Sequence, residues 1–129
     1  MNDVNGVVLV VDDNDDSRSL LLRRLERKGY EVVEASDARK GLQVIQNQQI
    51  DLVLLDHMMP GISGLEALKL VRQKFSEADL PVIMVTGRQD RGNILEAMHL
   101  GASDYITKPV NFSKLLEQIE TQLSRKEAE

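Results

Sequence analysis

Five side chains that can bind a metal ion or a phosphoryl group stand at or directly after the ends of short apolar runs. They are three carboxylates, one hydroxyl and one ammonium group, in chain order Asp12, Asp13, Asp56, Thr86 and Lys108. Apolar runs of this kind are typical of parallel strands that are covered on both faces. Because the carboxyl ends of parallel strands share one edge of the sheet, where ligands bind, we expect the five groups to converge. The predicted chemistry is the binding of a divalent cation and a phosphoryl group.

The three carboxylates favour a hard divalent cation. Strands one and three are neighbours in a flavodoxin-like sheet, so Asp12, Asp13 and Asp56 are predicted to form one cluster. Clustered carboxylates raise each other's pKa unless a cation compensates their charge. Mg²⁺ suits such a site because it binds oxygen, retains water and accepts a phosphate oxygen, and Mn²⁺ is an alternative. Acidic residues after strands also serve as ordinary helix N-caps, a role that we assign to Asp15 or Asp16.

The composition is that of one soluble globular domain. The chain has 129 residues, of which 42% are hydrophobic and 29% are charged. A net charge of −5 argues against direct nucleic-acid binding, and the absence of cysteine excludes disulfides, thiolate catalysis and zinc–thiolate sites. The N-terminus does not resemble a signal peptide, and no apolar stretch approaches the roughly 20 residues of a membrane span. We therefore expect a cytoplasmic protein with no membrane partner.

Strand-like runs alternate with helix-like patterns five times along the chain. The predicted strands are 7–11, 31–35, 52–55, 81–86 and 104–107, and the predicted helices are 16–28, 37–47, 64–74, 90–100 and 112–123. Short connections between them predict parallel strands with right-handed crossovers. The expected fold class is α/β, a (βα)5 doubly wound, five-stranded parallel sheet of flavodoxin-like type in the order 2-1-3-4-5. We expect one domain over 1–129, with a core of about 7–123 and a charged tail or linker at 124–129.

Residues that favour helix ends mark several boundaries. Ser36 and Asn111 are candidate N-caps, Ser63 forms a capping-box pattern with Glu66, and Gly29 is placed to end the first helix. The apolar residues of the first and last helices are spaced to face the core, with the cations of the first helix outward. These apolar sets are Leu20, Leu21, Leu22 and Leu25 in the first helix, and Phe112, Leu115, Leu116, Ile119 and Leu123 in the last.

Four segments resemble the receiver domain of two-component response regulators, the CheY-like family. They are VLVVDDN, DLVLLDHMMPGISGLEAL, PVIMVTG and GASDYITKPV, and the likeness extends over about residues 7–123. The resemblance implies a signalling domain that accepts a phosphoryl group on Asp56 from a sensor histidine kinase or a phosphotransfer protein. Such a domain is not an enzyme in the usual sense, since it catalyses only its own phosphorylation and dephosphorylation. The residues agree, because a carboxylate is a competent nucleophile and phosphoryl transfer depends mainly on positioning and charge neutralisation.

The resemblance also implies a set of metal ligands around Asp56, the phosphoacceptor. Asp13 would bind Mg²⁺ directly together with Asp56, and Asp12 would act mainly through a metal-bound water. The backbone carbonyl of Met58 would complete the share of the coordination shell that the protein supplies. Pro60 matches the proline that this family carries in the loop after its phosphoacceptor.

Further residues are implied to neutralise charge and to transmit the signal. A cis bond to Pro109 would aim Lys108 into the pocket, and the small Gly87 would leave room for the donor. The hydroxyl of Thr86 would move toward a phosphoryl oxygen, and the side chain of Tyr105 would then turn inward. The output surface would be the face of the fourth helix, fifth strand and fifth helix, which binds an output domain, an effector protein or a second copy as a homodimer.

Two positions depart from the best-known member of the family. Met58 and Arg88 stand two residues after the phosphoacceptor and the threonine, where neither can orient an attacking water. Our hypothesis is that both set the lifetime of the phosphorylated form, with Met58 shielding the acyl phosphate. His57 is expected to point away from the pocket because neighbours on a strand face opposite sides, and His99 suits the negative end of its helix.

Three other functions are alternatives to that of a phosphorylated receiver domain. A haloacid-dehalogenase-like phosphatase uses similar groups, but its D-x-D-x-T or D-x-D-x-V motif is not matched at residues 13–17 and the cap insertion is missing. An FMN-binding flavodoxin needs a phosphate loop rich in Ser, Thr and Gly after the first strand, which this chain lacks. A docking receiver that works without phosphorylation does not require the reactive residues that this chain retains. The sequence leaves open the partner kinase and whether the chain stands alone or belongs to a longer regulator.

Overall fold

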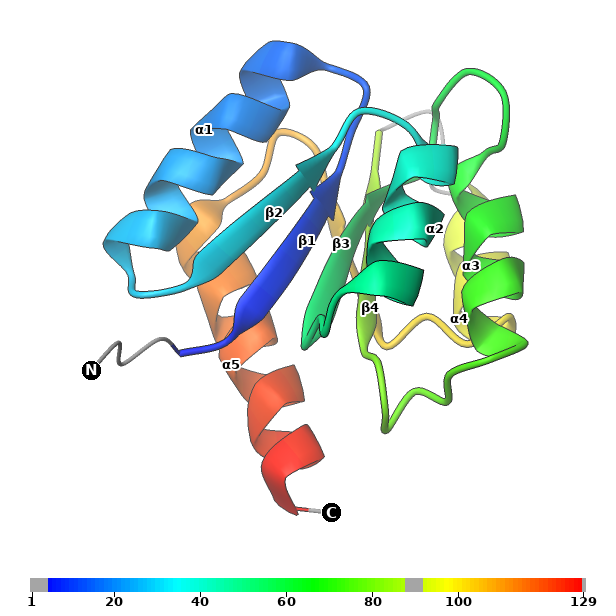
Figure 1. Ribbon diagram of the computed structural model, residues 1–129. Helices are drawn as coiled ribbons and strands as arrows, with labels where there is room; N and C mark the ends of the chain where they lie inside the picture. The colour runs from blue at the N-terminus through cyan, green and yellow to red at the C-terminus, as the bar shows by residue number, and fades with distance from the viewer. Residues whose placement is uncertain (1–4, 88–91, 129) are drawn as a thin grey trace.

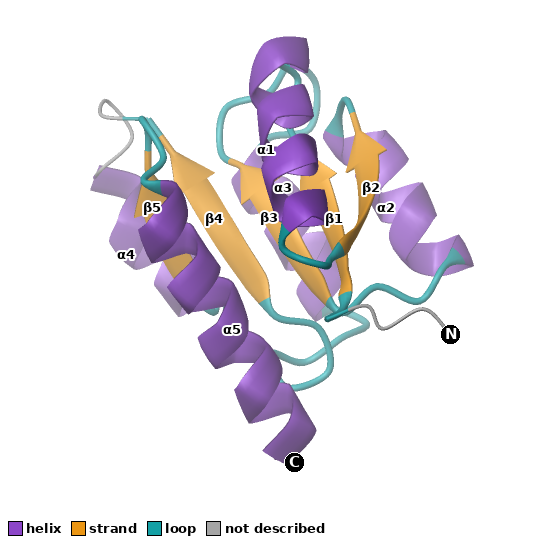
Figure 2. Cartoon of the chain, turned by 90° about the vertical axis from the view of Figure 1, so that its left-hand side faces the viewer, coloured by secondary structure: helices purple, strands orange, loops and turns teal. Residues whose placement is uncertain are grey.

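Five parallel strands form one sheet in the order β2-β1-β3-β4-β5, as predicted. The computed structural model describes residues 5–87 and 92–128. The strands are β1 (Val7–Val11), β2 (Glu31–Ala35), β3 (Leu52–Asp56), β4 (Val82–Thr86) and β5 (Asp104–Thr107). The helices are α1 (Asp15–Arg27), α2 (Ala38–Asn47), α3 (Gly64–Arg72), α4 (Ile94–His99) and α5 (Phe112–Ala128). Helices α1 and α5 cover one face of the sheet and α2, α3 and α4 cover the other (Figures 1 and 2).

The core consists of two apolar layers, one on each face of the sheet. In β1, Val8 and Val10 pack toward α1 and α5, whereas Leu9 and Val11 pack toward the other three helices. This alternation follows from the pleat of a strand, and it explains why the central strands are apolar along their whole length. All strands point the same way, so their carboxyl ends form one edge, at the top of Figure 1.

Two predicted helix caps are wrong. Asn14 caps α1, where Asp15 or Asp16 was expected, and its side chain accepts a hydrogen bond from the backbone N–H three residues on. Asp37 caps α2 in place of Ser36 in the same way. Each site offers adjacent polar residues of similar capping preference, so the point where the preceding strand ends decides which of them is used.

Other boundary predictions are confirmed. The backbone N–H of Glu66 donates to Ser63 Oγ over 3.2 Å, and Asn111 Oδ1 accepts from the N–H three residues on. Gly29 follows α1 with a φ of +91°, a left-handed conformation in which a side chain is strained. Helix α5 continues through residues 124–128, where the sequence suggested a charged tail, and Asp90 lies outside the described residues.

One expected core residue is exposed. Leu20 faces solvent, whereas Leu21 and Leu25 are buried against the sheet. Three consecutive leucines spread over more than half of a helix circumference, so they cannot all face the same layer. Over residues 5–87 and 92–128, no helix is long and apolar enough to cross a membrane.

Candidate functional site

Adjacent strand ends place three carboxylates within reach of a single ion. Val11 pairs with Leu55 in the sheet, so Asp12 and Asp56 stand side by side one residue further on. One oxygen each from Asp12, Asp13 and Asp56 lie within 4.8 Å of one another. Asp12 and Asp56 are buried and Asp13 is exposed, so the cluster is open on one side. Such oxygen donors fit Mg²⁺, which keeps several waters.

Lys108 brings a positive charge to the same point from the end of β5. Its Nζ lies 3.4 Å from Asp56 Oδ2 and 3.7 Å from Asp12 Oδ2. The peptide bond from Lys108 to Pro109 is cis, as the family resemblance implied. The backbone N–H of Lys108 donates to the carbonyl of Thr86 over 2.7 Å, which ties this residue to the end of β4.

The carboxylates outnumber the cations in this site. Burial, followed by the charge of Asp12, raises the pKa of Asp56 from 3.8 to about 6, and Lys108 opposes the rise. Asp13 also raises it, to a smaller extent. Lys108 therefore does not offset the combined effect of burial and the two neighbouring carboxylates on the pKa of Asp56. A bound divalent cation would correct this imbalance and keep Asp56 ionised.

Arg18 is a site residue that sequence analysis missed. Its Nη1 donates to the backbone carbonyl of Asp12 over 2.7 Å, while its other nitrogens bind Asp15 and Glu34 at 2.6 and 3.1 Å. The N–H of Asn14 donates to Asp12 Oδ1 over 2.8 Å. Together they fix the loop after β1. Arg18 was expected to point outward with the other cations of α1. Its place in the first turn of α1 was the sequence feature that could have predicted its contact with the loop after β1.

Gly64 is a second residue that was missed. A Cβ at this position would collide with the backbone carbonyl of Asp56 and lie 2.8 Å from His57 Cα. The N–H of Gly64 donates to the carbonyl of His57 over 2.9 Å. The start of α3 therefore packs directly against the backbone at the end of β3, and only glycine leaves room for this approach. Its place directly after the N-cap Ser63 was the signal in the sequence.

Thr86 is the last residue of β4, and Tyr105 lies on the neighbouring strand β5, paired with Met84. The side chain of Thr86 is only 2% exposed, and its Oγ1 has no hydrogen-bond partner among the described residues. A buried hydroxyl without a partner costs free energy, so such a group points to a ligand that satisfies it. Gly87 follows it, and Tyr105 stands exposed on the adjacent strand.

The residues that follow Asp56 and Thr86 in the chain differ in exposure and in direction. Met58 is 57% exposed and Pro60 is exposed, whereas Arg88 lies outside the described residues. His57 is buried, and its Nε2 lies 3.3 Å from Asn93 Nδ2 at the start of α4, so it is directed to the α4 side of the sheet. His99 is exposed in the last turn of α4.

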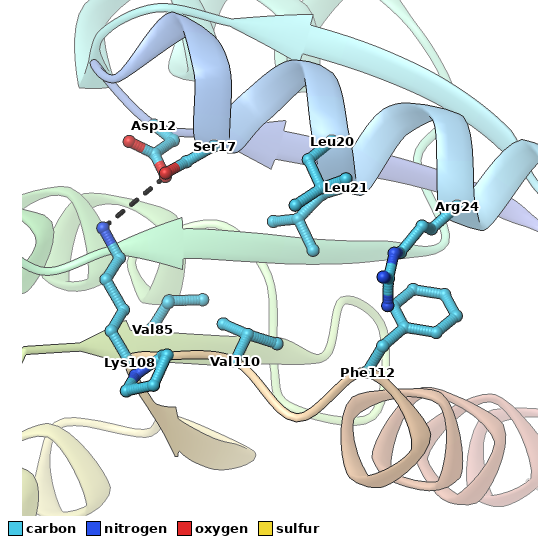
Figure 3. Close-up of a pocket in the computed structure, with 10 residues that line it drawn as sticks. Asp12, Ser17, Leu20, Leu21, Arg24, Val85, Lys108, Val110 and Phe112 are labelled. Atoms are coloured by element: carbon cyan, nitrogen blue, oxygen red, sulfur yellow. Dashed lines mark ion pairs between the residues drawn. The ribbon is translucent and has the colours of Figure 1, made fainter.

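A cavity of about 300 Å³ opens beside the site, between α1 and the loop after β5 (Figure 3). Asp12 and Lys108 lie at one end of it. Arg24 stacks over the ring of Phe112 at the other end, with 5.4 Å between Arg24 Cζ and the ring centroid. Leu20, exposed on α1, lines the wall between them. A largely apolar groove therefore leads to Asp12 and Lys108 at the edge of the carboxylate cluster.

The site and its sheet order are those of a response regulator receiver domain. The family model with that description matches residues 8–120, and the chain belongs to this family. It is a two-component signalling domain of CheY-like fold and not a conventional enzyme. Receiver domains generally bind Mg²⁺ at an acidic pocket, and the cluster at Asp12, Asp13 and Asp56 corresponds to that pocket.

Several known proteins resemble this chain over nearly its whole length. It is 35% identical to the phosphate regulon transcriptional regulatory protein PhoB of Pseudomonas aeruginosa, over 95% of this chain and 53% of that protein. It is 39% identical to the transcriptional regulatory protein YrkP of Bacillus subtilis, over 92% and 49%. A receiver domain protein from Clostridium thermocellum superimposes with a TM-score of 0.90, at 32% identity over 95% and 98% of the two chains. The chain thus spans about half the length of the curated relatives it matches.

Proposed function

We propose that this receiver domain accepts a phosphoryl group on Asp56 from the phosphohistidine of a sensor histidine kinase or a phosphotransfer protein. The observation that carries the proposal is the environment of Asp56. This carboxylate is buried, two further carboxylates lie beside it, and Lys108 Nζ lies 3.4 Å from its Oδ2. In the transfer, the P–N bond of the donor breaks while a P–O bond forms to Asp56, giving an acyl phosphate. We place this exchange in the cytoplasm, where phosphohistidine donors are made from ATP.

Each residue of the site would have a separate role in the transfer. Asp13, Asp56 and the backbone carbonyl of Met58 would hold Mg²⁺ directly, with Asp12 acting through a water. Bound Mg²⁺, or Mn²⁺ in its place, supplies positive charge next to the transferring oxygens. Lys108 supplies the remaining positive charge from the end of β5, since its Nζ already faces Asp56. Charge neutralisation and positioning are the main requirements of phosphoryl transfer.

The donor protein would approach along the apolar groove beside Asp12. Leu20, Arg24 and Phe112 line this groove and lead toward Lys108 (Figure 3). Leu20 is exposed although it is a leucine, and a large exposed apolar side chain next to a reactive site favours an interaction surface. Gly87 would leave room for the phosphoryl group beside Thr86.

Phosphorylation would change the surface of α4, β5 and α5. The buried Oγ1 of Thr86 lacks a partner among the described residues, so a phosphoryl oxygen would give it one. Tyr105 would then turn inward into the space that Thr86 leaves. The population of the domain shifts because the phosphorylated site favours one of two conformations. This surface would bind an output domain, an effector protein or a second copy of the chain.

The proposal is tested by treating the protein with acetyl phosphate and Mg²⁺ and measuring its intact mass. We expect the wild type and the control variant Asp79→Asn, whose carboxylate is exposed and distant, to gain one phosphoryl group. Asp56→Asn should gain none, and EDTA should prevent the gain in the wild type and in Asp79→Asn. A phosphoryl group on another residue would contradict the proposal. Sustained release of phosphate from a phosphate monoester would indicate a phosphatase instead.

Met58→Asn should shorten the lifetime of the phosphorylated form severalfold. The exposed thioether of Met58 cannot orient a water, whereas an amide at this position can do so beside the acyl phosphate. The rate is measured as the loss of phosphoryl mass after removal of acetyl phosphate. Met58→Leu is the matched control and should decay at the wild-type rate. An unchanged rate in Met58→Asn would remove Met58 from the residues that set the lifetime.

A further inference from the structure

Helix α4 is weakly attached to the rest of the protein by apolar contacts. It has only six residues, all of them described, and Ala97 is the one that is buried. Leu95 on its surface is 82% exposed. A helix with so little buried apolar surface takes its position from the polar contacts at its two ends.

Asn93, at the N-terminal end of α4, does not cap its own helix. Its backbone is helical, with φ −94° and ψ −1°, and its side chain makes no capping hydrogen bond among the described residues. In contrast, Asn14, Asp37 and Ser63 have extended backbones and accept a hydrogen bond from their own helices. Asn93 instead places Nδ2 3.3 Å from His57 Nε2. A side chain well suited to capping is thus directed to the residue that follows β3.

His57 is a rigid partner for this contact. It directly follows Asp56, and its side chain is only 5% exposed. Its backbone N–H donates to the carbonyl of Val85 over 3.0 Å, and its carbonyl accepts from Gly64 over 2.9 Å. His57 is therefore fixed to β4 on one side and to α3 on the other.

The other end of α4 is held by an arginine of α3. Arg72 Nε donates to the carbonyl of Gly101, just after α4, over 2.8 Å. Nη1 of the same side chain donates to the carbonyl of Leu80 over 2.8 Å, so the guanidinium is anchored in the loop before β4 as well. The two ends of α4 therefore depend on different contacts, and only the N-terminal one reaches the neighbour of Asp56.

We propose that His57 is a positioning residue which, through Asn93, holds the first turn of α4 in place until Asp56 is phosphorylated. This inference rests on the proposed phosphorylation of Asp56. When Thr86 turns toward the phosphoryl oxygen, the first turn of α4 shifts relative to His57, which stays fixed between Val85 and Gly64. The contact between His57 and Asn93 then breaks, and Asn93 becomes free to cap α4. The helix pivots about its C-terminal end, where Arg72 binds Gly101.

The inference is tested by recording the backbone amide NMR signals of α4 with and without acetyl phosphate and Mg²⁺. In unphosphorylated His57→Phe, the signals of Ile94–Met98 should shift most of the way toward the positions that the phosphorylated wild type shows. Asn93→Ser, whose side chain can cap a helix but is too short to reach His57, should shift in the same direction. His57→Gln, which can bind Asn93 again, should restore the wild-type positions. Gly101 should move little in every case, because Arg72 holds it.

Intact mass separates this inference from the proposed function. All three variants should still gain a phosphoryl group, and the control Asn47→Ala, at the end of α2, should leave the α4 signals unchanged. If wild-type protein gains no phosphoryl group, the proposed function fails. If it does gain one while Asn93→Ser keeps wild-type α4 signals before phosphorylation, the inference is overturned. Because Asn93 does not cap α4, this second variant keeps the test decisive even where His57→Phe does not fold.

Discussion

Asp56→Asn is expected to be more stable than the wild type at neutral pH without divalent metal, by up to about 3 kcal/mol. The variant would lose its phosphoryl acceptor and yet gain free energy of unfolding. The reason is that burial and the charge of Asp12 oppose the ionisation of Asp56 and raise its pKa from 3.8 to about 6. Asparagine has a similar shape and carries no charge, so it avoids this repulsion.

The gain should depend on pH in a defined direction. Below pH 3.8 the carboxyl group is protonated in both the folded and the unfolded chain, so it causes no difference in stability. Between pH 3.8 and about 6 the unfolded chain releases its proton first, and the folded wild type loses stability as the pH rises. The difference between Asp56→Asn and wild type should therefore grow over this interval and remain constant above it.

Urea unfolding over this pH range, with and without Mg²⁺, measures the effect. Mg²⁺ should stabilise the wild type by about 2.7 kcal/mol at one hundred times its dissociation constant and should stabilise Asp56→Asn much less. The control Asp79→Asn replaces an exposed carboxylate and should follow the wild type within about 0.5 kcal/mol. Equal stability of Asp56→Asn and wild type at every pH would mean that Asp56 is not under the electrostatic stress described above.

Arg72→Met should lower the free energy of unfolding by about 2 to 4 kcal/mol. Arg72 Nε and Nη1 donate to the carbonyls of Gly101 and Leu80 at 2.8 Å each, and Nη1 also lies 3.3 Å from the carbonyls of Phe75 and Ser76. Methionine fills similar volume but donates no hydrogen bond, so these carbonyls would lose their donor. Part of this loss is offset, because the substitution also removes a buried charged group. Nη2 of Arg72 is buried without a partner among the described residues, and burial lowers the pKa of the guanidinium.

Chemical denaturation at neutral pH measures this loss. Arg39→Met, on the exposed surface of α2, is the matched control and should change stability by no more than about 0.5 kcal/mol. Arg72→Lys should fall between Arg72→Met and wild type, since one ammonium group cannot reach all of these carbonyls. If Arg72→Met is as stable as Arg39→Met, then the guanidinium contributes nothing net to the attachment of α4 and its neighbouring loops.

The order of the elements and the edge of the sheet where the site lies both follow from patterns in the sequence. Apolar runs such as 52–55 specify strands buried on both faces, and the helices between them impose parallel pairing. Parallel strands align their carboxyl ends, so Asp12 and Asp56 had to meet wherever β1 and β3 became neighbours. This step needs no knowledge of side-chain packing.

Local patterns were less successful where several residues of similar preference compete. Asp15 and Asp16 are capping residues as good as Asn14, and Ser36 is as good as Asp37. The choice between them depends on where β1 and β2 end, which is set by the pairing of the strands. Leu20 was misplaced for a related reason, because a run of leucines indicates an apolar helix but does not say which of them faces the sheet.

The contacts between residues that are distant in the chain could not be predicted from the sequence and are visible only in the folded protein. The turning of Arg18 toward Asp12, the unsatisfied hydroxyl of Thr86 and the approach of Asn93 to His57 all depend on how helices pack on the sheet. A sequence pattern reports the periodicity of one segment at a time. The direction of a polar side chain instead depends on which donors and acceptors other segments bring next to it, and that arrangement exists only in the folded protein.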